Sequence, residues 1–221
     1  MQILKFGGSS IQTPERIKNV LGIIKAASAN GKIAVVVSAL GGVTGNLIEA
    51  AELAGRGDNR YENVLDEIGK RHVAVVEALL NNRSAARDRV SLKLQELRQI
   101  LLGTFLIKEL SPRTLDLVMS FGERLSAFII SESLKKLSVK ADYLDSSALI
   151  KTDDSFGDAV VQVEKTYRNI RRYFKEHPGL QVVTGFIAAN EQGQVTTLGR
   201  SGSDYTAALL GAALKVEEVE I

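Results

Sequence analysis

Short apolar runs alternate along this chain with longer stretches whose apolar residues recur at helical spacing. Residues 2–6 (QILKF) and 32–38 (KIAVVVS) are predicted strands, and the second is typical of a parallel strand that is buried on both faces. Between them a helix is predicted, with Thr13 as its N-cap, Pro14 at its first position and its end before Gly31. Strand, helix and strand in this order indicate a βαβ unit.

A long helical region follows, over residues 43–138. Residues 61–80 and 85–102 carry clear helical periodicity, and a further helix over 116–137 is expected to be interrupted or strained at Phe121 and Gly122. Alternation of strands and helices then resumes. Strands are predicted over 140–144, 180–186, 194–198 and from 216, and helices over 163–177 and 204–214.

This order of elements predicts an α/β fold. We expect a three-layer α/β/α sandwich with a mostly parallel central sheet, and a helical insertion over about residues 56–110. No composition break or repeat divides the chain, so residues 1–221 are interpreted as a single domain.

Composition excludes several classes of function. The 28 basic and 26 acidic residues leave a net charge of +2, which gives no electrostatic case for a nucleic-acid partner or an anionic membrane surface. Cysteine is absent and there are two histidines, so neither thiolate catalysis nor a histidine-rich metal site is expected. The first residues are interpreted as a strand and not as a signal peptide, and no apolar run reaches about 18 residues, so we expect a cytoplasmic protein.

Two glycine-rich turns follow the first two predicted strands. In residues 5–10 (KFGGSS), Gly7, Gly8 and Ser9 leave backbone N–H groups free for an anion, and Lys5 supplies a nearby ammonium. The alternative is a plain turn with a solvated lysine.

The second turn lies within residues 36–44 (VVSALGGVT). It offers the hydroxyls of Ser38 and Thr44 to a ligand at the same edge of the sheet. The alternative for Thr44 is that it simply caps the next helix.

Two further segments carry charged residues beside glycine. In residues 120–127 (SFGERLSA), Glu123 is placed to hold a ligand ammonium, or it forms an exposed pair with Arg124. In residues 197–207 (TLGRSGSDYTA), Arg200 suits a carboxylate or phosphate, Ser203 is an N-cap or a ligand hydroxyl, and Asp204 can orient Lys5 or a magnesium ion. Without a ligand, this last turn is a serine-capped helix start with an acid in its first turn.

Taken together, these four segments and residues 184–188 (TGFIA) resemble the aspartokinases of the amino-acid kinase family, in the order of that family and over the whole chain. The resemblance implies transfer of the γ-phosphoryl group of ATP to the β-carboxylate of L-aspartate. Mg²⁺ would be held mainly through the ATP phosphates, with no metal site of protein ligands. Residues 144–160 further resemble the kinase half of bifunctional aspartokinase–homoserine dehydrogenases. The full-length protein is expected to be a homo-oligomer.

The resemblance also assigns roles to residues. Lys5 and Asp204 would be catalytic, with Lys5 neutralising the transferring phosphoryl group and Asp204 organising Lys5 and the metal. The ATP phosphates would be held by Lys5, Gly7, Gly8 and Ser9. Aspartate would be held by Ser38, Thr44, Glu123, Arg200 and Ser203, with Arg200 on the α-carboxylate and Glu123 on the ammonium.

The sequence departs from the family pattern in two places. Ser201 stands where many relatives carry glycine, and the chain ends at Ile221, before the segment that helps to hold adenosine in relatives. We therefore expect a kinase domain truncated at its C-terminus, with weak or no kinase activity by itself. Two other functions remain open. One is an amino-acid kinase for a glutamate-type substrate, and the other is a non-catalytic amino-acid sensor.

Overall fold

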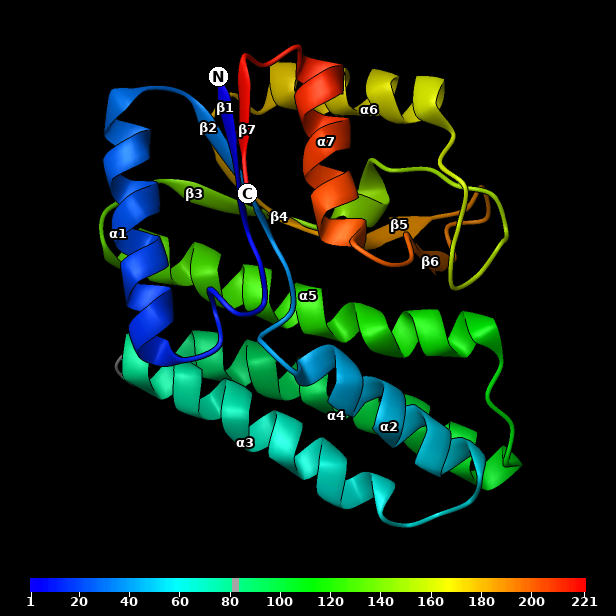
Figure 1. The fold of residues 1–221 in the computed structure, drawn as a ribbon. Coiled ribbons are helices and arrows are strands. Elements are labelled where there is room, and N and C mark those ends of the chain that lie inside the picture. Colours follow the sequence, from blue (N-terminus) through cyan, green and yellow to red (C-terminus); the bar gives the residue numbers. More distant parts are fainter. Residues whose placement is uncertain (81–83) are drawn as a thin grey trace.

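The computed structural model describes residues 1–80 and 84–221. Its central sheet has five strands in the order β3-β4-β2-β1-β7, and every neighbouring pair is parallel (Figure 1). The strands are β1 (Gln2–Phe6), β2 (Ile33–Val37), β3 (Ala141–Leu144), β4 (Leu180–Thr184) and β7 (Glu218–Glu220). The predicted parallel sheet is confirmed.

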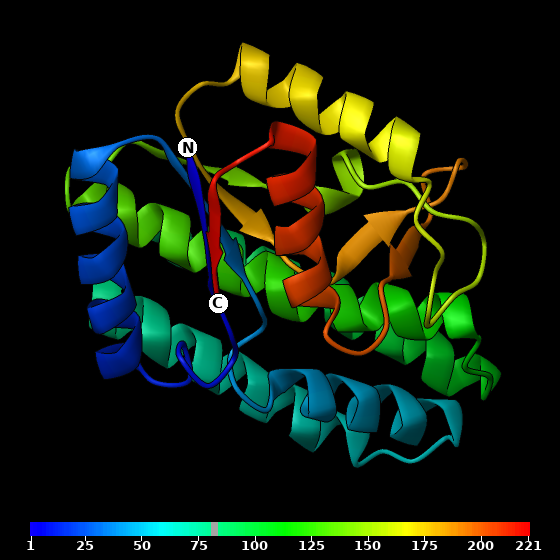
Figure 2. The same cartoon turned by 45° about the horizontal axis from the view of Figure 1, so that its top comes forward.

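Helices cover both faces of this sheet. On one face, α1 (Pro14–Asn30) and α5 (Pro112–Lys136) pack on the strands. On the side of α5 away from the sheet lie α2 (Val43–Gly55), α3 (Tyr61–Leu80) and α4 (Ser84–Ile107), which share the same apolar core. The other face carries α6 (Val163–Glu176) and α7 (Gly202–Leu214), as the rotated view in Figure 2 makes clear. The three-layer α/β/α sandwich is therefore confirmed.

The side-chain pattern of β2 explains why both faces are covered. Val35 and Val37 belong to the apolar core shared with α1 to α5, whereas Ala34 and Val36 belong to the core shared with α6 and α7. All of these side chains are fully buried. Because successive residues of a strand point to opposite faces, a continuous apolar run needs a helical layer on each side.

Helices α3 and α4 fall within the insertion predicted over about residues 56–110, of which residues 81–83 lie outside the described residues. The single-domain interpretation of residues 1–221 stays a prediction. In the described part of the chain, no helix is long and apolar enough to cross a membrane.

One expectation about a single element was wrong. Helix α5 runs without interruption from Pro112 to Lys136, so Gly122 breaks nothing. A Cβ atom at Gly122 would lie 2.7 Å from Cβ of Ala39, and the glycine therefore allows α5 to pack closely on the turn after β2.

The strand predicted over 194–198 is confirmed, and it lies outside the central sheet. It forms β6 (Val195–Thr197), which pairs antiparallel with the short strand β5 (Ile187–Ala189). That pairing gives the segment before Arg200 its own support, beside the carboxyl end of the main sheet. The short 3-10 helix η1 (Ser146–Ala148) also had no counterpart in the predicted elements.

Candidate functional site

A cavity of about 510 Å³ lies at the carboxyl edge of the central sheet. Of the residues that the sequence predicts as functional, the cavity is lined by Lys5, Gly8, Ser38, Thr44, Glu123, Arg200, Ser203 and Asp204. Gly7 and Ser9 belong to the same turn as Gly8 but do not line the cavity. Four segments that are far apart in sequence are thus brought to one place, as expected for the carboxyl ends of parallel strands.

Lys5, the penultimate residue of β1, forms an ion pair with Asp204 in the first turn of α7. The side chain of Lys5 is 10% exposed and that of Asp204 is 39% exposed. In the described part of the chain, the backbone N–H groups of Gly7, Gly8 and Ser9 donate no hydrogen bond. The turn therefore combines an ammonium group with free N–H donors, which is the combination that a phosphate requires.

Glu123 lies on α5 and is only 3% exposed, so the alternative of an exposed pair with Arg124 is wrong. Its Oε1 accepts a hydrogen bond of 3.0 Å from the N–H of Ala39, and Oε2 has no partner among the described residues. Arg124 instead pairs with Asp145, at 2.8 Å from Nε to Oδ2. Burial raises the pKa of Glu123 to about 8, with the Ala39 N–H opposing that shift.

This carboxyl group is thus held in a low-dielectric place with one oxygen unsatisfied. A ligand ammonium at Oε2 would supply both the missing hydrogen bond and the compensating charge.

Arg200 lines the same cavity and lies in the exposed turn between β6 and α7. The N-cap of α7 is Ser201, with a φ of 57°, and its side chain makes no capping hydrogen bond. Ser203 is therefore the second residue of the helix rather than its cap, and it is 8% exposed. The start of α7 faces the cavity together with the guanidinium of Arg200, so this side of the site favours anions.

Two hydroxyl groups complete the predicted set. The N-cap of α2 is Gly42, so Thr44 is not a cap, contrary to the alternative drawn from the sequence. Across the described residues, neither the Ser38 nor the Thr44 hydroxyl makes a hydrogen bond, although the Ser38 carbonyl accepts one of 2.6 Å from Oγ of Ser126. Both hydroxyls are available to a ligand in the cavity.

Sequence reasoning gave no role to several lining residues, among them Ile48, Met119, Gly157 and Phe186. Met119 lies one turn before Glu123 on α5, and this spacing was sufficient to find it. Phe186 has a φ of 68°, a conformation that a bulky side chain rarely adopts, and it stands within the segment at 184–188. Gly157 lies within residues 144–160, for which the sequence gave a resemblance but no role in the site.

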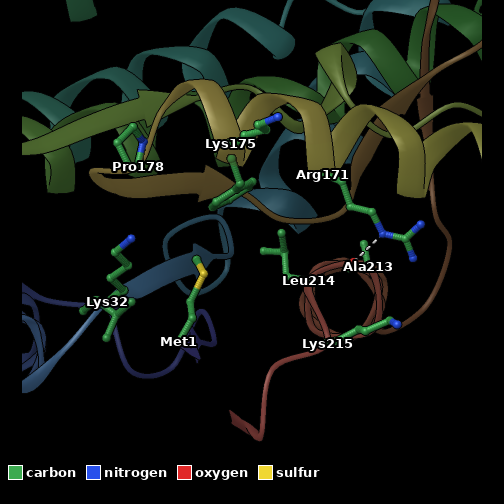
Figure 3. Close-up of a pocket in the computed structure, with 10 residues that line it drawn as sticks. Met1, Lys32, Arg171, Lys175, Pro178, Ala213, Leu214 and Lys215 are labelled. Carbon is green, nitrogen blue, oxygen red and sulfur yellow. Dashed lines mark hydrogen bonds between the residues drawn. The ribbon is translucent and has the colours of Figure 1, made fainter.

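A second cavity, of about 590 Å³, lies at the opposite, amino edge of the sheet (Figure 3). It is lined by Met1, Lys32, Ile33, Arg171, Phe174, Lys175, Pro178, Ala213, Leu214 and Lys215. None of the predicted site residues belongs to it, so size alone does not identify the candidate site.

The carboxylates of the candidate site suit a magnesium ion held mostly by its substrate. The lining includes two carboxylates, Glu123 and Asp204, and the described residues contain no cluster of three or more metal-ligating side chains. Mg²⁺ commonly takes one or two protein carboxylates, with substrate phosphates and water as its other ligands. Asp204 fits this role because it is partly exposed beside Lys5.

Comparisons with known proteins point to one family. The chain is 35% identical to aspartokinase 1 of Arabidopsis thaliana, over 99% of the chain and 39% of the relative. It is 28% identical to a bifunctional aspartokinase/homoserine dehydrogenase of Buchnera aphidicola, over 100% of the chain and 28% of the relative. The chain therefore spans well under half the length of these curated relatives.

Solved structures give the same result. The fold matches Escherichia coli aspartokinase III in complex with lysine and aspartate, with a TM-score of 0.91 and 30% identity, over 99% of the chain and 48% of that protein. The same enzyme in complex with aspartate and ADP gives a TM-score of 0.89. The resemblance to aspartokinases is confirmed. The model of the amino acid kinase family matches residues 1–221, and the chain belongs to that family.

Proposed function

We propose that the protein carrying this chain phosphorylates the β-carboxylate of L-aspartate with ATP. The observation that carries this proposal is Glu123, whose buried Oε2 lacks a partner in a cavity that Arg200 also lines. An α-amino acid presents an ammonium and a carboxylate together, and these two residues complement both groups. The similarity to named aspartokinases supports L-aspartate as that amino acid.

Lys5 and the turn after β1 supply the other half of the proposed reaction. The free N–H groups of this turn and the ammonium of Lys5 suit the phosphates of ATP, and Asp204 holds Lys5 in place. Asp204 is the partly exposed carboxylate that would hold Mg²⁺, and the ion would neutralise part of the phosphate charge. The aspartokinase III complex with aspartate and ADP supports ATP as the donor.

The chemistry requires alignment more than proton transfer. An oxygen of the β-carboxylate attacks the γ-phosphorus, the bond from that phosphorus to the bridging oxygen breaks, and ADP leaves with the electron pair. The carboxylate is already ionised at pH 7, so no general base is needed. Lys5 would stabilise the charge on the transferring group, which is the main form of catalysis in phosphoryl transfer.

A steady-state assay of the protein that carries this chain tests the proposal. ADP release and acyl phosphate formation are measured with L-aspartate, D-aspartate and L-glutamate as acceptors. L-aspartate should be the preferred acceptor, and Lys5→Met should lower kcat by about 100-fold or more. Lys32→Met is the matched control, because Lys32 lies at the opposite edge of the sheet and should leave kcat unchanged.

The two alternatives predict different results in the same assay. A kinase for a glutamate-type substrate would turn over L-glutamate faster than L-aspartate. A non-catalytic sensor would bind an amino acid with no release of ADP, and Lys5→Met would then have no effect. Either result would overturn the proposed function.

A further inference from the structure

Asp116 is a fully buried carboxylate near the start of α5, outside the lining of the candidate site. Its Oδ2 accepts hydrogen bonds from the N–H groups of Gly157, at 2.9 Å, and Thr197, at 3.0 Å. Its Oδ1 accepts a third, of 2.8 Å, from the hydroxyl of Thr197. No ion pair among the described residues includes Asp116, so dipoles alone compensate its charge.

These donors belong to two separate segments. Gly157 lies in the loop between η1 and α6, and Thr197 is the last residue of β6. The two segments also contact each other, because the N–H of Ala159 donates to the carbonyl of Thr197 at 2.9 Å. The hydroxyls of Thr152, in the same loop, and Thr196, in β6, also lie 2.8 Å apart. One carboxylate on α5 therefore binds a loop and a strand that also contact each other directly.

The loop and the strand both continue into the site. Gly157 itself lines the cavity, and Thr197 precedes the turn that carries Arg200 by three residues. At Gly199, which has a φ of 67°, a Cβ atom would collide with the carboxylate of Asp158. The loop is thus packed directly against the turn, one residue before Arg200.

The same helix carries the other half of the amino-acid site. Glu123 lies seven residues after Asp116 on α5, close to two helical turns, so both side chains project from similar faces. Asp116 therefore links the helix that carries Glu123 to the segment that leads into the Arg200 turn. The spacing between Glu123 and Arg200 decides whether one small amino acid can reach both groups.

We propose that Asp116 is a positioning residue for the amino-acid substrate. It holds the Arg200 turn at a fixed place relative to Glu123. This inference rests on the proposed function for the identity of the substrate, but its structural part does not. Burial raises the pKa of Asp116 while its three hydrogen bonds oppose that shift, so the group is sensitive to the loss of any donor.

The test compares four variants of the protein that carries this chain. Asp116→Asn keeps the size of the side chain but replaces one acceptor oxygen by an NH₂ group, which cannot accept from the Thr197 hydroxyl or, in the other orientation, from the two N–H groups. Thr197→Val removes one donor without changing the volume, and Thr197→Ser retains it. Thr166→Val is the matched control. Thr166 lies on α6, does not line the cavity and is as buried as Thr197, and its hydroxyl accepts a hydrogen bond of 3.0 Å from the backbone N–H of Lys151.

Two readouts are taken for each variant. The first is KM for L-aspartate and for ATP, with kcat. Asp116→Asn and Thr197→Val should raise KM for L-aspartate by about tenfold or more, and change KM for ATP by less than about twofold. Thr197→Ser and Thr166→Val should behave as the wild type. The second is amide hydrogen exchange over residues 197–204, which should become faster in Asp116→Asn and Thr197→Val, but not in Thr166→Val.

The outcomes separate this inference from the proposed function. An equal rise in both KM values, or unchanged exchange over residues 197–204 in both Asp116→Asn and Thr197→Val, would overturn the positioning role. If the wild-type protein does not phosphorylate L-aspartate, the proposed function fails, and the exchange measurement still decides what Asp116 does. If Asp116→Asn does not fold, Thr197→Val carries both readouts.

Discussion

At the residue scale, the site depends on a carboxyl group kept in an unfavourable environment. Glu123 is buried with one free oxygen and a raised pKa, and the neighbouring Ala39 N–H only partly compensates it. Such an arrangement costs folding free energy and is useful only when a cation arrives. Two predictions follow from its protonation.

The first prediction concerns proton release on binding. At pH 7 a carboxyl group with a pKa of about 8 is mostly protonated, whereas a bound ammonium would favour the ionised form. Binding of L-aspartate should therefore release about one proton per site. Calorimetric titration in buffers of different ionisation enthalpy measures this number. A binding enthalpy that is the same in all buffers would contradict the prediction.

The second prediction concerns the stability of Glu123→Gln. The folded pKa of about 8 is raised above the ordinary value of 4.5, so the contribution of Glu123 to stability is greatest below pH 4.5 and is lost as the pH rises to about 8. Above pH 8, Glu123→Gln should melt a few degrees higher than the wild type. The melting temperature of Glu123→Gln should also no longer rise when L-aspartate is added. A lower melting temperature at pH 8.5 would show that the carboxylate stabilises the fold.

At the scale of elements, the close approach of α5 to the turn after β2 places Glu123. Gly122 permits that approach, and the same helix carries Asp116 two turns earlier. The neighbouring helices form a large apolar layer, in which the imidazole of His72 on α3 is fully buried. Gly122 and His72 each lead to a prediction.

Gly122→Ala should push α5 away from Ala39, because the new methyl group would lie 2.7 Å from its Cβ. We expect a loss of about 1–3 kcal/mol in the free energy of unfolding. Binding of L-aspartate should weaken as well. Gly103→Ala is the matched control on α4, where a Cβ meets nothing within 4 Å and alanine should be neutral or stabilising. Equal effects of both changes on stability and binding would refute this reading of Gly122.

His72 should make the fold sensitive to acid. Burial lowers its pKa to about 4, from an ordinary value of 6.5, so the unfolded chain binds more protons between these two values. Stability should fall as the pH drops from 6.5 to 4, by on the order of 3 kcal/mol from this group. Urea unfolding of His72→Leu should show a weaker pH dependence than that of His177→Gln, whose histidine is exposed. Identical pH profiles would contradict the assignment.

Some elements were predictable because their signals are local. The β-branched run of β2 and the helical spacing in α3 identify both elements, and the Thr13 cap of α1 accepts the expected hydrogen bond, of 3.4 Å from the Arg16 N–H. The supposed break in α5 was wrong because a glycine within a helix can serve packing as well as termination. Strand β5 was missed because its three residues are too few to show a period.

At the scale of the whole molecule, the site exists because both helical layers meet at one edge of the sheet. Helix α5 from one layer carries Glu123, and the turn leading into α7 from the other carries Arg200 (Figures 1 and 2). The glycine-rich turns after β1 and β2 lie at the same edge because the strands are parallel, and the sequence therefore predicted their proximity. The hydrogen bonds that Glu123 and Asp116 accept come from residues 41 to 84 positions away in the sequence. No local spacing in the sequence predicts such contacts.

The central claim is that one part of this cavity, with Glu123 and Arg200, binds L-aspartate, and that another part, with Lys5, serves phosphoryl transfer. Equilibrium binding of L-aspartate to the protein that carries this chain, with Lys5→Met and Arg200→Ala beside the wild type, tests it most directly. The account predicts saturable binding to the wild type and to Lys5→Met, loss of binding in Arg200→Ala, and weaker binding of L-glutamate. Unchanged binding to Arg200→Ala, or a preference for L-glutamate, would contradict it.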